Sequence, residues 1–161
     1  MGFDFRTSNE GVLVMSLGTR QEVITHSPEE TIRVGYELAQ RLRQPALVLL
    51  EGELGSGKTT LVKGIVAGLG AAREEEVTSP SFTLVHEYGR DHKIYHADLY
   101  RVEGTREFAT LGLDDLLEQQ ATVIVEWGEK FLDQDVAAQV RIHMELLEGE
   151  ERCITIEGLG Q

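Results

Sequence analysis

Residues 52–59 of the chain read Gly-Glu-Leu-Gly-Ser-Gly-Lys-Thr and match the phosphate-loop pattern GxxxxGK[ST] at every fixed position. Glycines let such a loop bend tightly, so that its backbone N–H groups can face the oxygens of a phosphate. The lysine of the pattern reaches the β- and γ-phosphates of a nucleotide, and the hydroxyl after it can bind Mg²⁺. We therefore predict that Lys58 contacts phosphate and that Thr59 is a ligand of Mg²⁺.

The residues on either side of the loop support this interpretation. The apolar run 47–50 is typical of a buried parallel strand, and Leu61, Ile65 and Val66 follow the loop at helical spacing. A strand, a loop and then a helix is the context in which the motif binds phosphate. The alternative is a glycine-rich turn that carries an exposed lysine.

A second apolar strand, 122–125, ends at Glu126. Phosphoryl transfer depends on Mg²⁺ and on positioning, so a phosphate loop needs an acid at the end of a neighbouring strand. Glu126 could hold Mg²⁺ directly or through water, or it could orient the attacking water. The alternative is an ordinary carboxylate at a strand end. Trp127 follows it and could stack or pack near the site, with core packing as the default interpretation of that side chain.

Asp98 ends another predicted strand, and it is a candidate general base or an outer ligand of the metal site. His96 lies two residues earlier and should point to the same face of the sheet. It could orient Asp98, although a structural histidine is the preferred interpretation. A zinc site built from His86, His92, His96 and Asp98 is also conceivable, but the spacing matches no familiar ligand framework.

The segment 78–83 (TSPSFT) is rich in hydroxyls and contains a rigid proline. In nucleotide switches such a loop can sense the γ-phosphate or its Mg²⁺, which makes Thr78, Ser79 and Ser81 switch-like candidates. The same residues could equally form a turn that enters a strand. The chain has no Asn-Lys-x-Asp segment of the kind that recognises guanine, which favours ATP over GTP.

Composition limits the classes of partner. The chain has 161 residues, 28 acidic against 15 basic side chains and a net charge of −13. Nucleic-acid binders usually carry a basic face, so tight independent binding of RNA or DNA is not expected. Docking on a basic protein surface fits the charge, as does solubility alone. One cysteine, no apolar run of membrane-spanning length and no signal peptide point to the cytoplasm.

The predicted elements alternate in type. Ser27 should cap a helix that continues to about residue 42, with Glu30 completing a capping box. The remaining predicted elements are a short strand over 21–25, a hairpin with strands at 82–88 and 93–98, short helices over 105–120 and a final hairpin over 139–157. Together they predict an α/β fold: a P-loop NTPase-like mixed sheet with flanking helices and antiparallel edge hairpins, in a single domain.

Four ordered blocks give the chain a specific resemblance. They are GELGSGKTTLVKG at 52–64, TSPSFTLVHEY at 78–88, YHADLYR at 95–101 and VIVEWGEK at 123–130. They resemble the TsaE family, formerly called YjeE. The phosphate loop alone is generic, whereas SPSFTLV followed by HxDLYR and VEW is specific. The resemblance extends from about residue 23 to the final hairpin.

The resemblance implies a P-loop ATPase of tRNA threonylcarbamoyladenosine biosynthesis. Such a protein works with TsaB and TsaD in the modification of adenosine 37, and its ATP hydrolysis resets the complex between cycles. Carried onto this chain, the resemblance implies roles for the following residues. The ATP phosphates are expected to be held by Gly55, Ser56, Gly57, Lys58, Thr59 and Thr60. Mg²⁺ is expected at Thr59 and Glu126, and Asp98 is expected to serve hydrolysis. The switch-like segment would be Thr78–Ser81, the adenine would lie near Thr25–Pro28, and Arg152 would be a further contact.

Two other functions fit the residues without the resemblance. One is a small P-loop kinase, although no arginine-rich lid is evident. The other is a nucleotide-gated binding module with little catalysis. The first 20 residues precede the family-like start, so we expect an N-terminal extension over 1–20 and an ATPase domain over 21–161.

Overall fold

A computed structural model describes residues 4–7, 13–17, 20–80, 84–119, 121–128 and 140–159. The strands are β1 (Asp4–Thr7), β2 (Leu13–Leu17), β3 (Arg20–Thr25), β4 (Leu47–Gly52), β5 (Val85–Tyr88), β6 (Ile94–Asp98), β7 (Thr122–Glu126), β8 (Val140–Leu146) and β9 (Arg152–Glu157). The helices are α1 (Pro28–Arg41), α2 (Lys58–Gly68), α3 (Gly104–Thr110) and α4 (Leu113–Glu118), with a short 3₁₀ helix, η1, at Glu74–Glu76.

The described strands form one mixed sheet in the order β1-β2-β3-β9-β8-β4-β7-β6-β5. Its centre is parallel, because β4 pairs in parallel with β7 and β8, and β6 pairs in parallel with β7. Antiparallel strands flank this centre on both sides, as the sequence predicted for its two hairpins. Strand β2 pairs antiparallel with β3, and β1 pairs antiparallel with β2 at the edge of the sheet.

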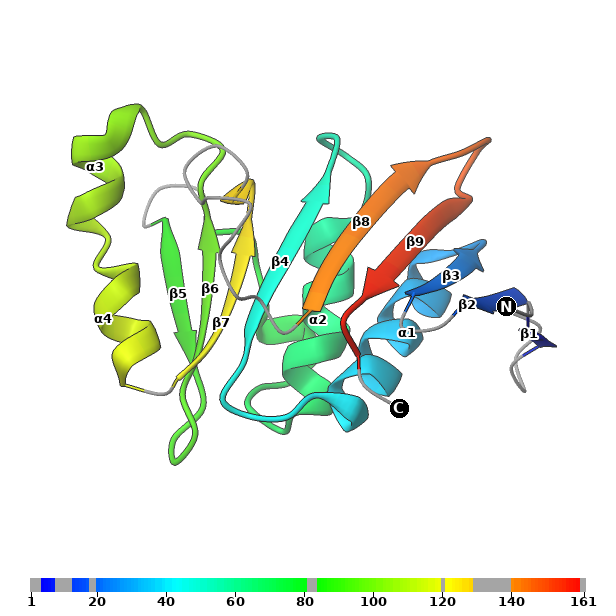
Figure 1. Cartoon of the computed structure of the whole chain (residues 1–161), viewed down its shortest axis with the longest axis horizontal. Helices are drawn as coiled ribbons and strands as arrows, with labels where there is room; N and C mark the ends of the chain where they lie inside the picture. The colour runs from blue at the N-terminus through cyan, green and yellow to red at the C-terminus, as the bar shows by residue number, and fades with distance from the viewer. Residues whose placement is uncertain are drawn as a thin grey trace.

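Helices cover the two faces of the sheet unequally (Figure 1). Val48 and Leu50 of β4 belong to the larger core cluster, which includes large apolar side chains of α1 and α2. Leu47 and Leu49 belong to a second cluster, which includes Leu113 at the start of α4. Strand β4 is therefore buried on both faces, which explains why its sequence is continuously apolar rather than alternating.

The start of α1 follows the predicted capping pattern with one difference. Ser27 is the N-cap, and its side chain accepts a hydrogen bond from the Glu30 N–H. The Glu30 carboxylate accepts from the N–H of His26, one residue before the cap, at 2.8 Å. This backbone hydrogen bond is the main reason why the pKa of Glu30 is lowered.

Helices α1 and α2 approach each other closely because small residues face one another. A Cβ atom on Gly64 of α2 would lie 2.1 Å from the carbonyl oxygen of Ile32, and one on Gly35 of α1 would lie 2.6 Å from the carbonyl oxygen of Leu61. Both contacts are with backbone, which cannot move aside as a side chain can. The position of the helix that follows the phosphate loop therefore depends on these glycines.

The structure confirms the predicted α/β fold with its mixed sheet, and it places short helices on both sides of Gly112, as expected. Residues 74–76, three consecutive glutamates, form the short helix η1. In the parts of the chain that the structure describes, no helix is long and apolar enough to span a membrane.

We expect Gly64→Ala to destabilise the protein by about 2 kcal/mol, because overpacking a tight contact forces backbone shifts. Urea unfolding followed by circular dichroism measures this change. Glu37→Ala, at an exposed position of α1, is the control and should change stability by less than about 0.5 kcal/mol. An unchanged unfolding midpoint for Gly64→Ala would show that α1 and α2 can separate at no cost.

Candidate functional site

A cavity of about 340 Å³ opens beside the phosphate loop. Three neighbouring parallel strands converge on it, because Asp98 of β6 pairs with Glu126 of β7, and Glu126 pairs with Leu50 of β4, just before the loop. The cavity is lined by Leu54, Gly55, Gly57, Lys58, Thr59, Thr60, Ser79, Asp98, Glu126, Trp127 and Arg152. It therefore brings together most of the residues that the sequence singled out for chemistry.

The phosphate loop has the backbone that its glycines predict. Gly55 and Gly57 have φ angles of 83° and 99°, in the left-handed region that glycine adopts without strain. Gly57 is the N-cap of α2, so the loop passes directly into the N-terminus of that helix. Ser56 is buried rather than part of the cavity wall, and its Oγ has no hydrogen-bond partner among the described residues.

Lys58 is only 6% exposed, and its ammonium is held by the loop itself. Nζ donates hydrogen bonds to the carbonyl oxygens of Gly52, at 2.7 Å, and Glu53, at 2.9 Å. It also lies 4.6 Å from the ring centroid of Trp127, within the range of a cation–π contact. These contacts compensate for the burial of the Lys58 charge, and the Lys58 side chain also lines the cavity.

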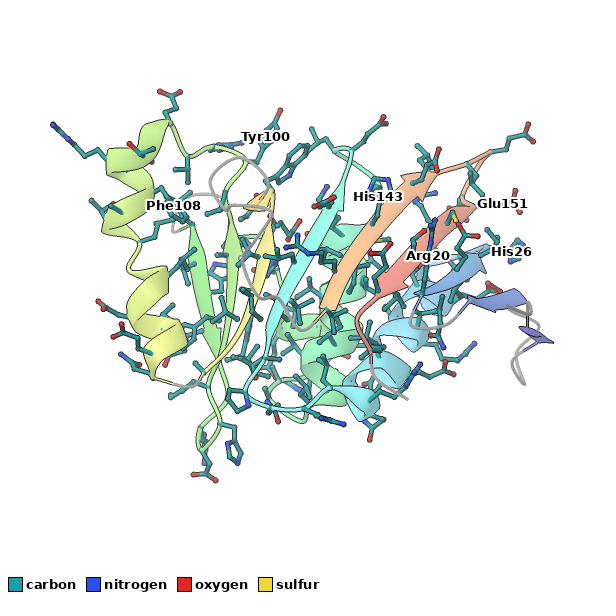
Figure 2. All side chains as sticks on the ribbon, in the orientation of Figure 1. Arg20, His26, Tyr100, Phe108, His143 and Glu151 are labelled. Atoms are coloured by element: carbon teal, nitrogen blue, oxygen red, sulfur yellow. The ribbon has the colours of Figure 1, made fainter. Side chains whose placement is uncertain are left out.

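Trp127 follows Glu126 and lines the cavity, although core packing was its default interpretation. Its φ angle is 62°, which is unusual for a bulky residue. The indole packs against the second core cluster and against Tyr100, with the two ring centroids 5.0 Å apart. Figure 2 shows Tyr100 at the upper edge of the molecule, where β4 and β7 end.

Glu126 and His96 form a buried pair. The Glu126 side chain is 3% exposed and that of His96 is fully buried, and His96 Nε2 is hydrogen-bonded to Glu126 Oε2. The alternation predicted for His96 and Asp98 holds, but His96 contacts Glu126 and does not orient Asp98. Its other nitrogen, Nδ1, has no hydrogen-bond partner among the residues described.

Asp98 joins the cavity to the hydroxyl-rich segment. Its Oδ2 accepts a hydrogen bond from Ser79 Oγ at 3.3 Å, and its Oδ1 accepts one from the N–H of Tyr100 at 3.0 Å. Thr78 lies outside the cavity wall, with its backbone bonded to Tyr88 and His86. Ser81, the third switch-like candidate, lies outside the described residues.

A smaller pocket of about 50 Å³ adjoins the cavity. Ser27 and Pro28 at the start of α1 form one side of it, and Gly57, Thr60 and Arg152 are shared with the cavity. His26 and Glu151, labelled in Figure 2, join the start of α1 to the turn between β8 and β9 at 3.2 Å. The residues predicted to lie near the adenine thus sit next to the phosphate loop.

The donor set on the cavity wall suits a hard cation. Thr59 offers a hydroxyl and Glu126 a carboxylate, and Mg²⁺ is typically bound by one or two such protein oxygens together with phosphate and water. Within the described ranges, no group of three or more His, Cys, Asp or Glu side chains is arranged to hold a metal.

Four cavity or rim residues were missed or left as guesses by the sequence reasoning: Leu54, Tyr100, Trp127 and Arg152. Trp127 and Tyr100 directly follow the motif residues Glu126 and Asp98–Leu99, so proximity in the sequence was an available signal. Arg152 starts β9, and only the sheet order brings it beside the loop. Leu54 occupies a variable position of the loop pattern and is 70% exposed.

Comparison with known proteins gives a consistent result. The family model described as threonylcarbamoyl adenosine biosynthesis protein TsaE matches residues 25–154. A Treponema pallidum protein named tRNA threonylcarbamoyladenosine biosynthesis protein TsaE is 33% identical, over 83% of this chain and 97% of that protein. A Bacillus subtilis protein of the same name is 36% identical over 84% of each chain. The crystal structure of Bacillus subtilis YdiB is similar in fold, with a TM-score of 0.65 and 31% identity over 90% of this chain and 89% of YdiB.

The buried pair predicts a coupled effect on stability. We expect His96→Leu to lower the free energy of unfolding by about 1–3 kcal/mol, since it leaves the Glu126 carboxyl without this partner. The double variant His96→Leu/Glu126→Leu should lose less than the sum of the two single variants, because it leaves no buried polar partner behind. Urea unfolding of all four proteins measures the coupling, and simple additivity would contradict the pairing.

Proposed function

The chain belongs to the TsaE family of threonylcarbamoyladenosine biosynthesis proteins, and on that premise we propose that it is a Mg²⁺-dependent ATPase of tRNA modification. It acts at adenosine 37 together with TsaB and TsaD, in the cytoplasm, and its turnover of ATP resets their complex. The observation that carries the proposal is the single cavity that gathers Lys58 and Thr59 of the phosphate loop with Asp98 and Glu126.

The phosphate loop supplies the binding of ATP. The backbone N–H groups of Gly55–Thr60 lie at the N-terminus of α2, where the helix dipole favours binding of an anion. Lys58 exchanges its bonds to Gly52 and Glu53 for oxygens of the β- and γ-phosphates. The adjoining pocket at Ser27 and Pro28 takes the nucleoside, and Arg152 lies between the two parts.

The acids supply hydrolysis. Asp98 faces the cavity with both oxygens engaged by donors, which holds the carboxylate in one orientation for the attacking water. Glu126, held by His96, and the Thr59 hydroxyl would bind Mg²⁺. A cation held by these residues would supply positive charge that offsets the charge of the phosphates. Lys58 and the loop N–H groups stabilise the charge that develops in the transition state.

The net charge of the chain supports a role in which partner proteins bind the tRNA. A net charge of −13 disfavours independent binding of tRNA by this chain, so the partner proteins hold the substrate. The hydrogen bond between Ser79 and Asp98 gives the hydroxyl-rich segment a direct contact with the hydrolytic site. Through this contact the segment can report whether the γ-phosphate is present.

The test is release of phosphate from Mg·ATP by the purified chain, alone and with TsaB, TsaD and tRNA in each combination. We expect stimulation by the partners. Lys58→Ala should reduce turnover by at least about 100-fold, because it removes the ammonium group that stabilises negative charge in the transition state. Phosphate appearing on a protein, tRNA or small molecule would favour a kinase. Absence of stimulation by every combination would refute the partner role.

Asp98→Ala separates binding from hydrolysis. We expect kcat to fall by about 100-fold while the Kd for ATP changes by less than about threefold, because Asp98 acts on water rather than on the nucleotide. The fluorescence of Trp127, the chain's only tryptophan, reports binding because it lies against Lys58. Asp91→Ala, at an exposed position of the β5–β6 turn, is the control. Loss of ATP binding in Asp98→Ala would make Asp98 structural.

A further inference from the structure

Lys63 connects the helix after the phosphate loop to the chain that leads into the hydroxyl-rich segment. It lies on α2 and is partly buried. Its Nζ donates hydrogen bonds to the carbonyl oxygen of Val77 at 2.5 Å and to that of Glu74 at 3.2 Å. Both acceptors are backbone atoms, one in the first residue of η1 and one in the residue that follows it. The ammonium therefore fixes the path of the main chain, independently of which side chains η1 carries.

The segment directly after Val77 is held from two further sides. Val77 itself is fully buried in the core. The Thr78 N–H donates to the Tyr88 hydroxyl at 3.4 Å, and the Thr78 carbonyl lies 3.2 Å from His86 Nδ1, both on β5. Ser79 then donates to Asp98 on β6. The backbone at 77–79 is thus placed by α2, β5 and β6 together.

Of these three attachments, the bond from Lys63 is the one that runs to the phosphate-loop helix. Any displacement of α2, even a small one, would move Lys63 with it, and the two carbonyl contacts would carry that displacement to Val77. Since Ser79 is only two residues further, its hydroxyl would then move relative to Asp98. Small displacements at such a site have large effects, because catalytic geometry is lost within about 1 Å.

We propose that Lys63 is a positioning residue for ATP hydrolysis, which holds the backbone at Val77 so that Ser79 meets Asp98 at the cavity. This role rests on the proposed ATPase function. It also gives the switch-like segment a mechanical connection to the nucleotide, through a residue that lies outside the cavity wall.

The decisive variant is Lys63→Met, which keeps an unbranched side chain and removes the three N–H donors. We expect kcat to fall about tenfold, with KM and the Kd for ATP within about threefold of the wild type. Lys63→Arg keeps donors at this position and should recover most of the loss. Lys93→Met is the matched control, because Lys93 donates to the Gly89 carbonyl in the β5–β6 hairpin, which does not line the cavity.

A double-mutant cycle distinguishes positioning from general loss of stability. If Lys63 acts through Ser79, then Lys63→Met and Ser79→Ala are not additive in kcat, and the double variant is no slower than the worse single variant. Additive effects, or a loss of kcat that follows the loss of stability in urea, would overturn the proposal. Turnover of Lys63→Met equal to the wild type, with Lys58→Ala inactive, would overturn it while leaving the ATPase function standing.

Hydrogen exchange gives a readout that does not depend on turnover. A non-hydrolysable ATP analogue with Mg²⁺ should slow amide exchange in the peptide 74–80 of the wild type. In Lys63→Met the analogue should still bind, as shown by Trp127 fluorescence, but exchange in that peptide should no longer respond. An equal response in both proteins would refute the coupling. A wild type that neither binds nor hydrolyses ATP would refute the proposed function, and the role of Lys63 with it.

Discussion

The parallel register of β6, β7 and β4 is the constraint on which the candidate site depends. It aligns Asp98 with Glu126 and Glu126 with Leu50, so that two acids arrive at the edge where β4 becomes the phosphate loop. A slip of one residue would turn these side chains to the opposite face of the sheet. The register is fixed by burial, since Val48 and Ile124 pack among the core residues of α1 and α2.

That arrangement places polar groups where water has little access. Lys58, Glu126 and His96 are each at most 6% exposed, and buried polar groups are costly unless they are hydrogen-bonded. Each has a partner in the protein: two carbonyls and an indole for Lys58, and each other for His96 and Glu126. The close packing of Gly64 against α1 keeps α2 rigid enough to maintain these contacts. The site is preorganised by the core beneath it.

Local patterns made much of this structure predictable. The apolar run of β4, the glycines of the loop and the Ser27 cap each act within a few residues, so their sequence signals were sufficient. The contact of His96 with Glu126 was not predictable, because the two residues are 30 positions apart. The alternation of side chains along a strand places His96 on the same face as Asp98, but it does not say which acid His96 contacts. Trp127 packs against the core, as expected, and the sequence could not decide that it would line the cavity as well. Lys63 gave no signal, because its acceptors are backbone carbonyls, which any sequence provides.

The contacts of Lys58 bear on how such a site could switch. The Lys58 ammonium is hydrogen-bonded to the carbonyl oxygens of Gly52 and Glu53, so it has partners within the protein itself. Within the proposed function, binding ATP replaces these bonds with bonds to phosphate and leaves two loop carbonyls to find other donors. The free energy gained on ATP binding is then smaller than the strength of the new contacts suggests, since hydrogen bonds are exchanged rather than added. A nearly balanced exchange suits a protein that alternates between an empty and an ATP-loaded state, because both states stay accessible. A partner's modest preference for one of them is then enough to shift the population.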